Sequence, residues 1–391
     1  MQKAKLWTKD FVIVSSINFL LTLVFYLLMI VIGVYAVNHY GATVSEAGLV
    51  TGIFVVGTLI GRLFTGRAID QVGRKKTLII GLILFTATSL LYFIDLNTGF
   101  LIFSRFVHGM MLGIASTATG TIVAQIIPPT RRGEGIGYYS MGATLATAIG
   151  PFLGLVLTQY MDIKVIFILC FILGVVSLLT AFTVRIPPLV IKSEEMERVK
   201  KVQLSQFIEP NAIPISIITL ILACGYAGIL SFINFYASEL QLVEAASFFF
   251  LVYAATVLLT RPFTGRLIDI KNANYVMYPG LVLYTIGLLL LGFTTNGFML
   301  LLSAVFVGLG FGNLQSCIQA IAIKVTPIER AGLATSTFYI FLDAGLGIGP
   351  YLLGFIIAFT SYSQLYIILA MAVFVAIGLY YVLHGKKEAT L

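Results

Sequence analysis

Asp343 is an acid inside a long apolar segment of the chain, and Tyr339 lies four residues before it. The segment begins near Ala331, so Asp343 lies about 18 Å along a helix that rises 1.5 Å per residue. Residues four apart share one helix face. A carboxyl group in apolar surroundings can hold a proton in one state and a cation in another. A neutral acid that is hydrogen-bonded to a neighbouring helix is the structural alternative.

Other apolar segments contain further groups that can carry charge. Arg105 and His108 are three residues apart, and histidine changes its charge near neutral pH. A buried charge costs about 2.5–3.5 kcal/mol in a bilayer even on the lenient insertion scale, so such groups are functional candidates. We predict that Asp343 carries the proton and that Arg105 and His108 have a functional role, with Arg105 reaching the outer interface as the alternative. Arg62 and Arg261 have no acid beside them locally, and we expect both to reach the cytoplasmic interface; contact with an anion or substrate is the alternative.

The elements that hold these residues are long apolar stretches. The chain has 391 residues, of which 59% are hydrophobic and only 10% are charged, whereas a soluble domain carries about 25% charged residues. A run of about 20 apolar residues spans the hydrocarbon core as a helix, and these runs are continuous, which argues against strands of alternating hydrophobicity. We predict twelve spans, which start near residues 11, 46, 77, 100, 134, 164, 211, 246, 275, 298, 331 and 363.

The basic residues predict the orientation of these spans. If both termini are cytoplasmic, 20 of the 24 Lys and Arg fall in cytoplasmic segments and only Lys164 falls outside, as the positive-inside rule requires. The other three, Arg62, Arg105 and Arg261, lie within the spans. The net charge of +8 then reflects basic loops against an anionic leaflet, and no nucleic-acid partner is expected. No cleavable signal peptide is evident. We expect a multi-pass protein of the cell membrane, in a bacterial plasma membrane.

A phrase of nine residues occurs twice. RLFTGRAID at 62–70 recurs as RPFTGRLID at 261–269, with seven identical positions and an offset of 199 residues. The same offset pairs IGP at 149–151 with IGP at 348–350. The chain therefore divides into two six-helix halves, which is one way to build alternating access. We place the N-terminal bundle at 1–186, a cytoplasmic linker at 187–210 and the C-terminal bundle at 211–391.

The run GRAIDQVGRKK at 66–76 resembles the loop 2–3 signature of the major facilitator superfamily, G-x-x-x-D-R-x-G-R-R. Gln71 departs from the signature, and the second copy keeps Gly265 and Asp269 but lacks the basic cluster. The resemblance covers essentially the whole chain. It implies an all-α integral membrane fold of 12 transmembrane helices in two pseudo-symmetric six-helix bundles.

In that superfamily the loop acid acts as a latch on a helix start, where the helix carries partial positive charge. Asp70 would dock on the start of the eleventh helix, and by the repeat Asp269 would face the fifth helix near Gly133. A plain basic loop with a capping Asp is the alternative. The predicted gating residues are Gly66, Asp70, Gly73, Arg74, Lys75, Gly265 and Asp269.

Two further segments resemble superfamily patterns. SRFVHGMMLG, which contains Arg105, resembles a fourth-helix signature, R-x-x-x-G, that is linked to proton coupling. GYYSMGATLATAIGPFLG resembles the fifth-helix pattern of antiporters, through Gly150, Pro151 and Gly154. Ala146 and Leu155 depart from that pattern, and a simple kink is the alternative.

Polar residues on the cavity-lining helices complete the predicted site. Helices one, four, seven and ten line the cavity in the superfamily, and an interhelical hydrogen bond is the alternative for each residue. The predicted cavity residues on these helices are Asn18, Tyr26, Asn234, Tyr236, Asn313 and Gln315, and Tyr339 on the eleventh helix, near Asp343, is added to them.

The sequence thus predicts a secondary transporter rather than an enzyme or a primary pump. No G-x-x-x-x-G-K-[ST] phosphate loop occurs, and the three scattered histidines form no metal cluster, so no cofactor or metal is expected. The resemblance to the drug:proton antiporter subfamily implies efflux of small amphipathic compounds, cationic ones among them, in exchange for protons, and multidrug resistance with it. Export of an endogenous metabolite, sugar or metallophore is the first alternative, and a proton-coupled nutrient importer is the second. We expect a monomer in the lipid bilayer, with a small-molecule substrate and protons as its partners.

Overall fold

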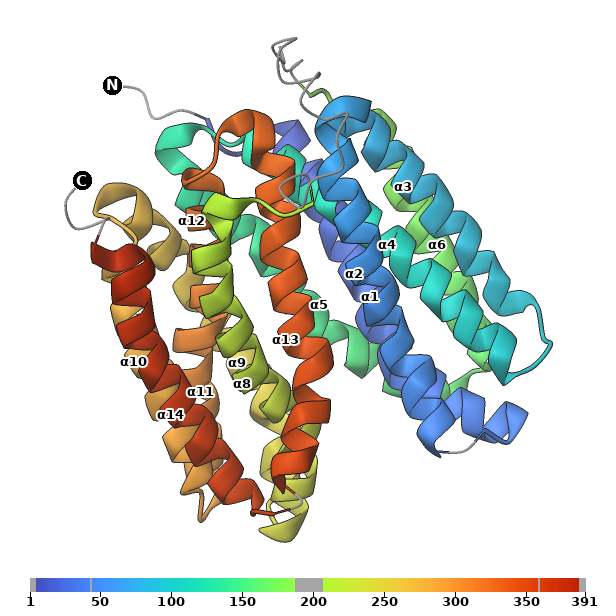
Figure 1. Cartoon of the computed structure of the whole chain (residues 1–391). Helices are drawn as coiled ribbons and strands as arrows, with labels where there is room; N and C mark the ends of the chain where they lie inside the picture. Colours follow the sequence, from blue (N-terminus) through green and yellow to red (C-terminus); the bar gives the residue numbers. More distant parts are fainter. Residues whose placement is uncertain (1–4, 43, 187–206, 358, 387–391) are drawn as a thin grey trace. The chain divides into compact units, whose positions relative to one another are not determined.

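The computed structural model describes residues 5–42, 44–186, 207–357 and 359–386, and in these ranges it contains helices and no strand (Figure 1). Within them, 11 helices are long and apolar enough to cross a membrane. The predicted span near residue 134 corresponds to a further helix of 29 residues, α5 (Arg132–Tyr160). The predicted all-helical membrane fold is confirmed, and the chain is an integral membrane protein.

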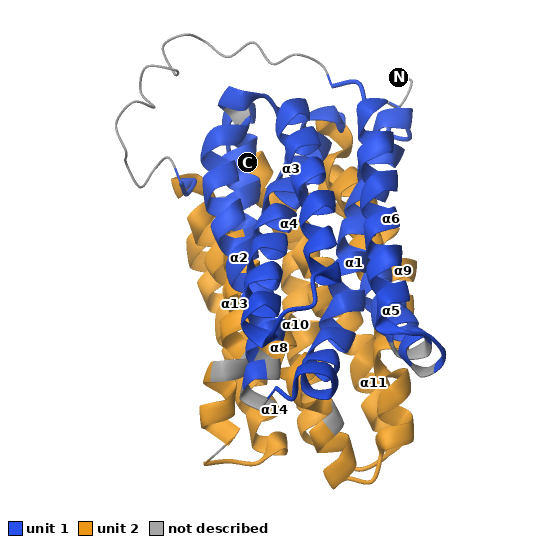
Figure 2. Cartoon of the chain, turned by 90° about the vertical axis from the view of Figure 1, so that its right-hand side faces the viewer, with its two compact units in different colours: residues 1–128, 145–209, 326–339 blue, residues 129–144, 210–325, 340–391 orange. Residues whose placement is uncertain are grey.

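The chain forms two compact units, which Figure 2 distinguishes by colour. Unit 1 comprises Met1–Pro128, Leu145–Glu209 and Thr326–Tyr339. In it α2 packs against α4, α3 packs against α4 and α6, and α1 contacts α2, α4 and α6. The complete helices of unit 1 are α1 (Lys9–Tyr40), α2 (Val44–Val72), α3 (Arg74–Ser89), η1 (Leu90–Phe93), α4 (Thr98–Ile126), α6 (Ile163–Phe182) and η6 (Ile328–Arg330).

Unit 2 comprises Pro129–Thr144, Pro210–Val325 and Ile340–Leu391. In it α10 packs against α11 and α14, and α14 packs against α8. It includes the start of α5, whereas the start of α13 (Ala331–Ile357) belongs to unit 1. The predicted boundaries at 186 and 211 stay a prediction. The complete helices of unit 2 are η2 (Pro129–Arg131), η4 (Pro210–Ala212), α8 (Ile213–Glu239), α9 (Val243–Ile270), α10 (Asn274–Gly292), α11 (Gly297–Val307), η5 (Gly308–Gly312), α12 (Asn313–Lys324), α14 (Tyr362–Tyr380) and η7 (Tyr381–Gly385).

The sequence repeat extends to the helix caps. Asn97 accepts a hydrogen bond from the amide of Phe100 at the start of α4, and Asn296, 199 residues later, does the same for Met299 at the start of α11. Asp162 caps α6, and its counterpart Ser361 caps α14. Asn, Asp and Ser are favoured at these positions because their side-chain oxygens satisfy amides that the first helical turn leaves unpaired. Corresponding helices therefore begin at corresponding residues.

The predicted tenth span is not one uniform helix. It runs as α11, a π-helical turn at η5 and then α12. Three of the five residues of η5 are glycines, and Asn313 donates from Nδ2 to the carbonyl oxygens of Gly308, at 3.3 Å, and Leu309, at 3.1 Å. The side chain of Asn313 thus adds hydrogen bonds to two carbonyl oxygens at this wider turn.

Candidate functional site

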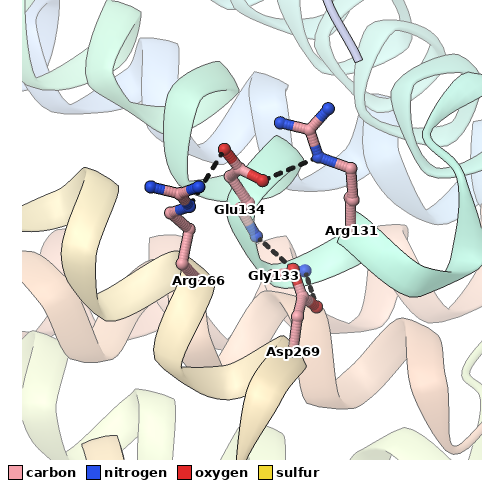
Figure 3. Close-up of polar contacts among 5 residues, drawn as sticks. All are labelled: Arg131, Gly133, Glu134, Arg266 and Asp269. Carbon is pink, nitrogen blue, oxygen red and sulfur yellow. Dashed lines mark hydrogen bonds and ion pairs between the residues drawn. The ribbon is translucent and has the colours of Figure 1, made fainter. Parts of the chain in front are cut away.

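The last turn of α9 presents Asp269 to the start of α5 (Figure 3). The amide of Gly133 donates to Oδ1 of Asp269 at 2.7 Å, and the amide of Glu134 donates to Oδ2 at 2.9 Å. The first amides of a helix have no partner within the helix and carry partial positive charge. The carboxylate satisfies two of them, and the contact predicted from the repeat is present.

Two glycines allow this close approach of α9 and α5. A Cβ atom on Gly265 would lie 2.8 Å from the carbonyl oxygen of Gly133, and a Cβ on Gly133 would lie 2.6 Å from the carbonyl oxygen of Gly265. Both distances are too short for a carbon atom against backbone. Each helix therefore needs glycine at the crossing, which gives a packing reason for the glycine in the repeated phrase.

Glu134 adds an ion-pair bridge to the same site. Its Oε2 lies 2.8 Å from Nε of Arg131, and its Oε1 lies 3.7 Å from Nε of Arg266 in the repeated phrase (Figure 3). Glu134 is buried, and its hydrogen bond raises the pKa of the Arg131 guanidinium above the ordinary value. The acid thus ties the start of α5 to α9 a second time.

The first copy of the phrase contacts the start of α13 within unit 1. Gly66 lies against Ser336, whose hydroxyl donates to the backbone oxygen of Arg62 at 2.7 Å. Arg74 donates to Oε1 of Gln125 at 3.0 Å and to the carbonyl oxygen of Ile328 at 2.8 Å. The side chain of Asp70 lies outside the described part of the structure, so its predicted latch stays a prediction.

Gly73 and Lys75 lie at the start of α3. Gly73 has a φ of +97°, a conformation that residues with a Cβ rarely adopt, and it precedes the first residue of α3. Nζ of Lys75 donates to the carbonyl oxygens of Phe182, at 3.2 Å, and Val184, at 2.7 Å. Both residues therefore have a structural role at the ends of α3 and α6.

Arg105, Tyr92 and His108 form a buried polar cluster in unit 1. The Tyr92 hydroxyl lies 2.8 Å from Nδ1 of His108 and accepts a hydrogen bond from Nη1 of Arg105 at 3.4 Å. Arg105 also donates from Nε to the carbonyl oxygen of Val50 at 3.3 Å, and its guanidinium lies 4.3 Å from the centre of the Phe54 ring. Arg105 and His108 are both 0% exposed. Arg105 therefore does not reach the interface.

The Tyr92 hydroxyl lies between Arg105 and His108. Because Arg105 can only donate, the hydroxyl oxygen accepts from it, and the hydroxyl proton is free to point at Nδ1 of His108. In that arrangement Nδ1 accepts, and the proton of a neutral ring is on Nε2. Within the described residues, Nε2 of His108 and Nη2 of Arg105 are buried without a hydrogen-bond partner. In that arrangement the cluster keeps two buried N–H donors, from which no described residue accepts a hydrogen bond.

Arg261 is buried in unit 2, contrary to the expected reach toward the interface. It is 1% exposed and donates from Nη1 to Oγ1 of Thr144 at 3.2 Å and from Nη2 to the carbonyl oxygen of Gly312 in η5. Arg62 is also buried, with its guanidinium 4.2 Å from the centre of the Tyr339 ring. The expectation that both arginines reach the interface was wrong because their partners lie far from them in the sequence. These partners are Thr144 and Gly312 for Arg261, and Tyr339 for Arg62.

Asp343 lies within α13, twelve residues after its start at Ala331, and is half-buried. Tyr339 precedes it by one helical turn and is half-buried too. Gly345 and Gly349 pack against α8, through Ala223 and Ala227 respectively. This packing fixes the rotation of that stretch of α13. At about 3.6 residues per turn, Asp343 is roughly 160° around the helix from Gly345 and roughly 120° from Gly349, so it lies away from the packed face.

The other predicted cavity residues have different surroundings. Asn18 is buried and accepts a hydrogen bond from Thr119 at 3.5 Å, and Tyr26 is half-buried on α1. Tyr236 is buried and donates to the carbonyl oxygen of Gly292 at 3.3 Å. Asn313 lies in the network of η5, and Gln315 is half-buried on α12. The Asn234 side chain lies outside the described part.

The antiporter-type residues of α5 pack against α1 in unit 1. A Cβ on Gly150 would lie 2.7 Å from Cβ of Tyr26, and one on Gly154 would lie 3.1 Å from the carbonyl oxygen of Leu27. Pro151 lies inside the helix. These small residues allow a close crossing of α5 and α1, which is the geometric part of the pattern.

Three residues of the site escaped sequence reasoning: Tyr92, Glu134 and Glu209. Tyr92 is one of 19 tyrosines, and nothing in its neighbourhood distinguishes it. Glu134 directly follows the Gly133 that the repeat identified, so its position was a usable signal. Glu209 lies at the end of the predicted linker, and Arg330, whose Nη2 lies 2.8 Å from Oε2 of Glu209, is 121 residues away.

Comparison with known proteins identifies a family and a fold. The sequence model described as "Major Facilitator Superfamily" matches residues 14–312 and 215–390. An uncharacterized MFS-type transporter of Methanocaldococcus jannaschii is 27% identical over 344 residues, which are 86% of this chain and 88% of that protein. The match extends over both halves of the chain.

Two solved structures of the superfamily share the fold. The MFS transporter FucP, in the outward conformation, has a TM-score of 0.75 at 15% identity and covers 94% of this chain and 97% of its own. The proton:xylose symporter XylE, bound to 6-bromo-6-deoxy-D-glucose, has a TM-score of 0.73 at 15% identity and covers 95% of each chain. At this identity, the likeness concerns the fold alone.

Proposed function

This chain belongs to the Major Facilitator Superfamily, and from this premise we propose that it exports small amphipathic compounds, cations among them, in exchange for protons. Transport proceeds by alternating access, without an enzymatic step. The fifth-helix pattern and Arg105 support the drug:proton antiporter subfamily. The proposed setting is the plasma membrane of a bacterium, with a monomeric protein and both termini in the cytoplasm.

The observation that carries the proposal is the position of Asp343. It is a half-buried acid twelve residues into a 27-residue helix that is apolar enough to span a membrane. A charge at such depth is costly. A bound proton or a bound cation removes that cost, so the two compete for one carboxylate. Competition of this kind makes a cation and a proton travel in opposite directions.

The cycle follows from this competition. Asp343 is deprotonated when it faces the cytoplasm, and its carboxylate binds the cationic group of the substrate. After the binding site opens to the outside, an external proton displaces the substrate, and the protonated site then opens to the cytoplasm again. Proton entry is favoured by about 2.3 kcal/mol per charge for each 100 mV of membrane potential. Arg105 and His108 are the proposed second part of the coupling.

Asp269 supplies the proposed gate. Its two hydrogen bonds to the start of α5, at 2.7 and 2.9 Å, form only while α9 and α5 are in contact. Breaking them is the proposed step that opens the cytoplasmic side. The gate residues Gly66, Gly73, Arg74 and Lys75, with Asp70, would serve the other copy.

The test uses purified protein in liposomes that contain a pH-sensitive dye. A proton gradient is imposed and a panel of cationic and anionic dyes is added, for the native protein, Asp343→Asn and Asp343→Glu. We expect cation-dependent proton movement in the native protein, its loss in Asp343→Asn and partial retention in Asp343→Glu. Proton movement that persists in Asp343→Asn would refute Asp343 as the carrier.

A second candidate is export of a compound with an anionic group, such as an acidic metabolite or a metallophore. Arg105 and Arg261 are fully buried and contact no carboxylate among the described residues, and Nε of Arg261 is buried without a hydrogen-bond partner there. Such a guanidinium can bind an anion strongly. In the same liposomes, flux of anionic dyes that is lost in Arg261→Gln and kept in Asp343→Asn would favour this candidate.

A further inference from the structure

The end of the predicted linker binds at the start of α13, within unit 1. Glu209 is 0% exposed, and its Oε2 lies 2.8 Å from Nη2 of Arg330. Arg330 belongs to η6 (Ile328–Arg330), the turn that leads into α13. The backbone amide of Glu209 also donates to Oγ1 of Thr337 on α13 at 2.8 Å. One linker residue thus holds α13 by its side chain and by its backbone.

Phe207 makes a second contact, with the repeated phrase on α2. The guanidinium of Arg67 lies 5.0 Å from the centre of the Phe207 ring. The centres of the Phe64 and Phe207 rings are 6.5 Å apart. A guanidinium within about 6 Å of an aromatic ring is attracted to it. Phe207 and Glu209 are two residues apart, so this short segment touches α2 and the start of α13 together.

The other copy of the gate explains why a linker acid is needed there. The 199-residue offset pairs Arg330 with Arg131 and Arg67 with Arg266. In unit 2 both of these arginines bind Glu134, at 2.8 and 3.7 Å. The counterpart of Glu134 is Leu333, a buried leucine. The α13 copy therefore has the arginines of the α5 copy and an apolar residue where that copy has its acid.

We propose that Glu209 is a positioning residue of the α13 gate, where it takes the place that Glu134 has in the α5 gate, with Phe207 covering the second arginine. Phe207 and Glu209, at the end of the linker, are then part of the gate. As a gating role this rests on the proposed function. The binding of the linker end itself does not, because it can be measured in protein that transports nothing.

The experiment is hydrogen exchange of the full-length protein in detergent, followed by mass spectrometry. We compare peptides that cover residues 328–337, at the start of α13, with peptides that cover 131–138, at the start of α5. Glu209→Gln should speed exchange roughly tenfold at the start of α13 and leave α5 unchanged. Glu134→Gln, the matched control, should have the reverse pattern. Arg330→Gln should reproduce Glu209→Gln and serves if that variant does not fold.

A rescue makes the proposal specific. Leu333→Glu puts an acid three residues after Arg330, the spacing at which Arg131 and Glu134 pair. Added to Glu209→Gln, it should restore slow exchange at the start of α13. Unchanged exchange there in both Glu209→Gln and Arg330→Gln, or failure of the rescue, would overturn the proposal. If the rescue variant regains slow exchange but the protein moves no substrate, the result would count against the transport proposal alone.

Discussion

Replacing Asp269 with asparagine tests whether the carboxylate holds the start of α5. Asparagine has nearly the same shape but keeps only one acceptor, and its NH2 group then faces the second amide. The carboxylate accepts from Gly133 and Glu134 at 2.7 and 2.9 Å. Hydrogen bonds to a charged group contribute about 1.5–3 kcal/mol each, and a negative charge at a helix start adds about 0.3–2 kcal/mol.

One acceptor remains and Asp269 is only half-buried, so we expect a loss of about 2 kcal/mol. At 1.36 kcal/mol for each factor of ten, that is roughly a 30-fold shift toward the open contact. Hydrogen exchange at the amides of residues 133 and 134 should quicken by about this factor. A site-resolved mass-spectrometric measurement is suitable, because these two amides are the atoms that lose their partner.

Asp162→Asn is the matched control for this measurement. Asp162 also accepts from a helix-start amide, that of Lys164 at 2.8 Å, but at the start of α6 in unit 1. It should quicken exchange in α6 and leave residues 133 and 134 unchanged. Equal exchange at these two amides in the native protein and in Asp269→Asn would show that the carboxylate contributes nothing to holding α5.

Two further substitutions test packing and the buried cluster, each by the free energy of unfolding in mixed detergent micelles. Gly265→Ala should cost about 1–3 kcal/mol, because its methyl group would meet backbone of α5. Gly378→Ala on α14, where nothing lies within 4 Å of the added atom, should be neutral or stabilising by up to about 1 kcal/mol; equal effects would contradict the packing argument. Tyr92→Phe should cost about 1–3 kcal/mol, because it leaves His108 and Arg105 each short of a buried partner. Tyr284→Phe, which loses one hydrogen bond at 3.1 Å to the helical carbonyl of Leu222, should cost less, and a larger loss there would contradict the assigned cluster.

The elements that the sequence predicted well are those with a local signal. The lengths of the apolar runs predicted where the helices lie, because a membrane-spanning helix needs about 20 apolar residues. The 199-residue repeat predicted the contact between Asp269 and Gly133, although 136 residues separate them in the sequence. That contact was predictable because the repeat transfers a relation from one half to the other, which single-residue propensities cannot do.

The features that the sequence did not predict depend on distant partners. Arg261 was expected at the interface, but Thr144 and Gly312 bind it inside unit 2, and neither lies near it in sequence. The π-helical turn at η5 was missed because GLGFG fits a regular apolar helix equally well. Glu209 was placed in a linker because its local sequence is polar, while its burial comes from Arg330 and Thr337.

The repeat also separates what the helix packing requires from what it does not. The counterparts of Tyr92, Arg105 and His108 are Leu291, Ala304 and Val307, and all three are 0% exposed. Unit 2 therefore builds corresponding helices with apolar residues at the three positions, so packing alone does not demand polar ones. A buried guanidinium in a membrane protein carries a cost that an alanine avoids. At these three positions the cost is borne in one half only, which supports the proposal that Arg105, Tyr92 and His108 take part in transport.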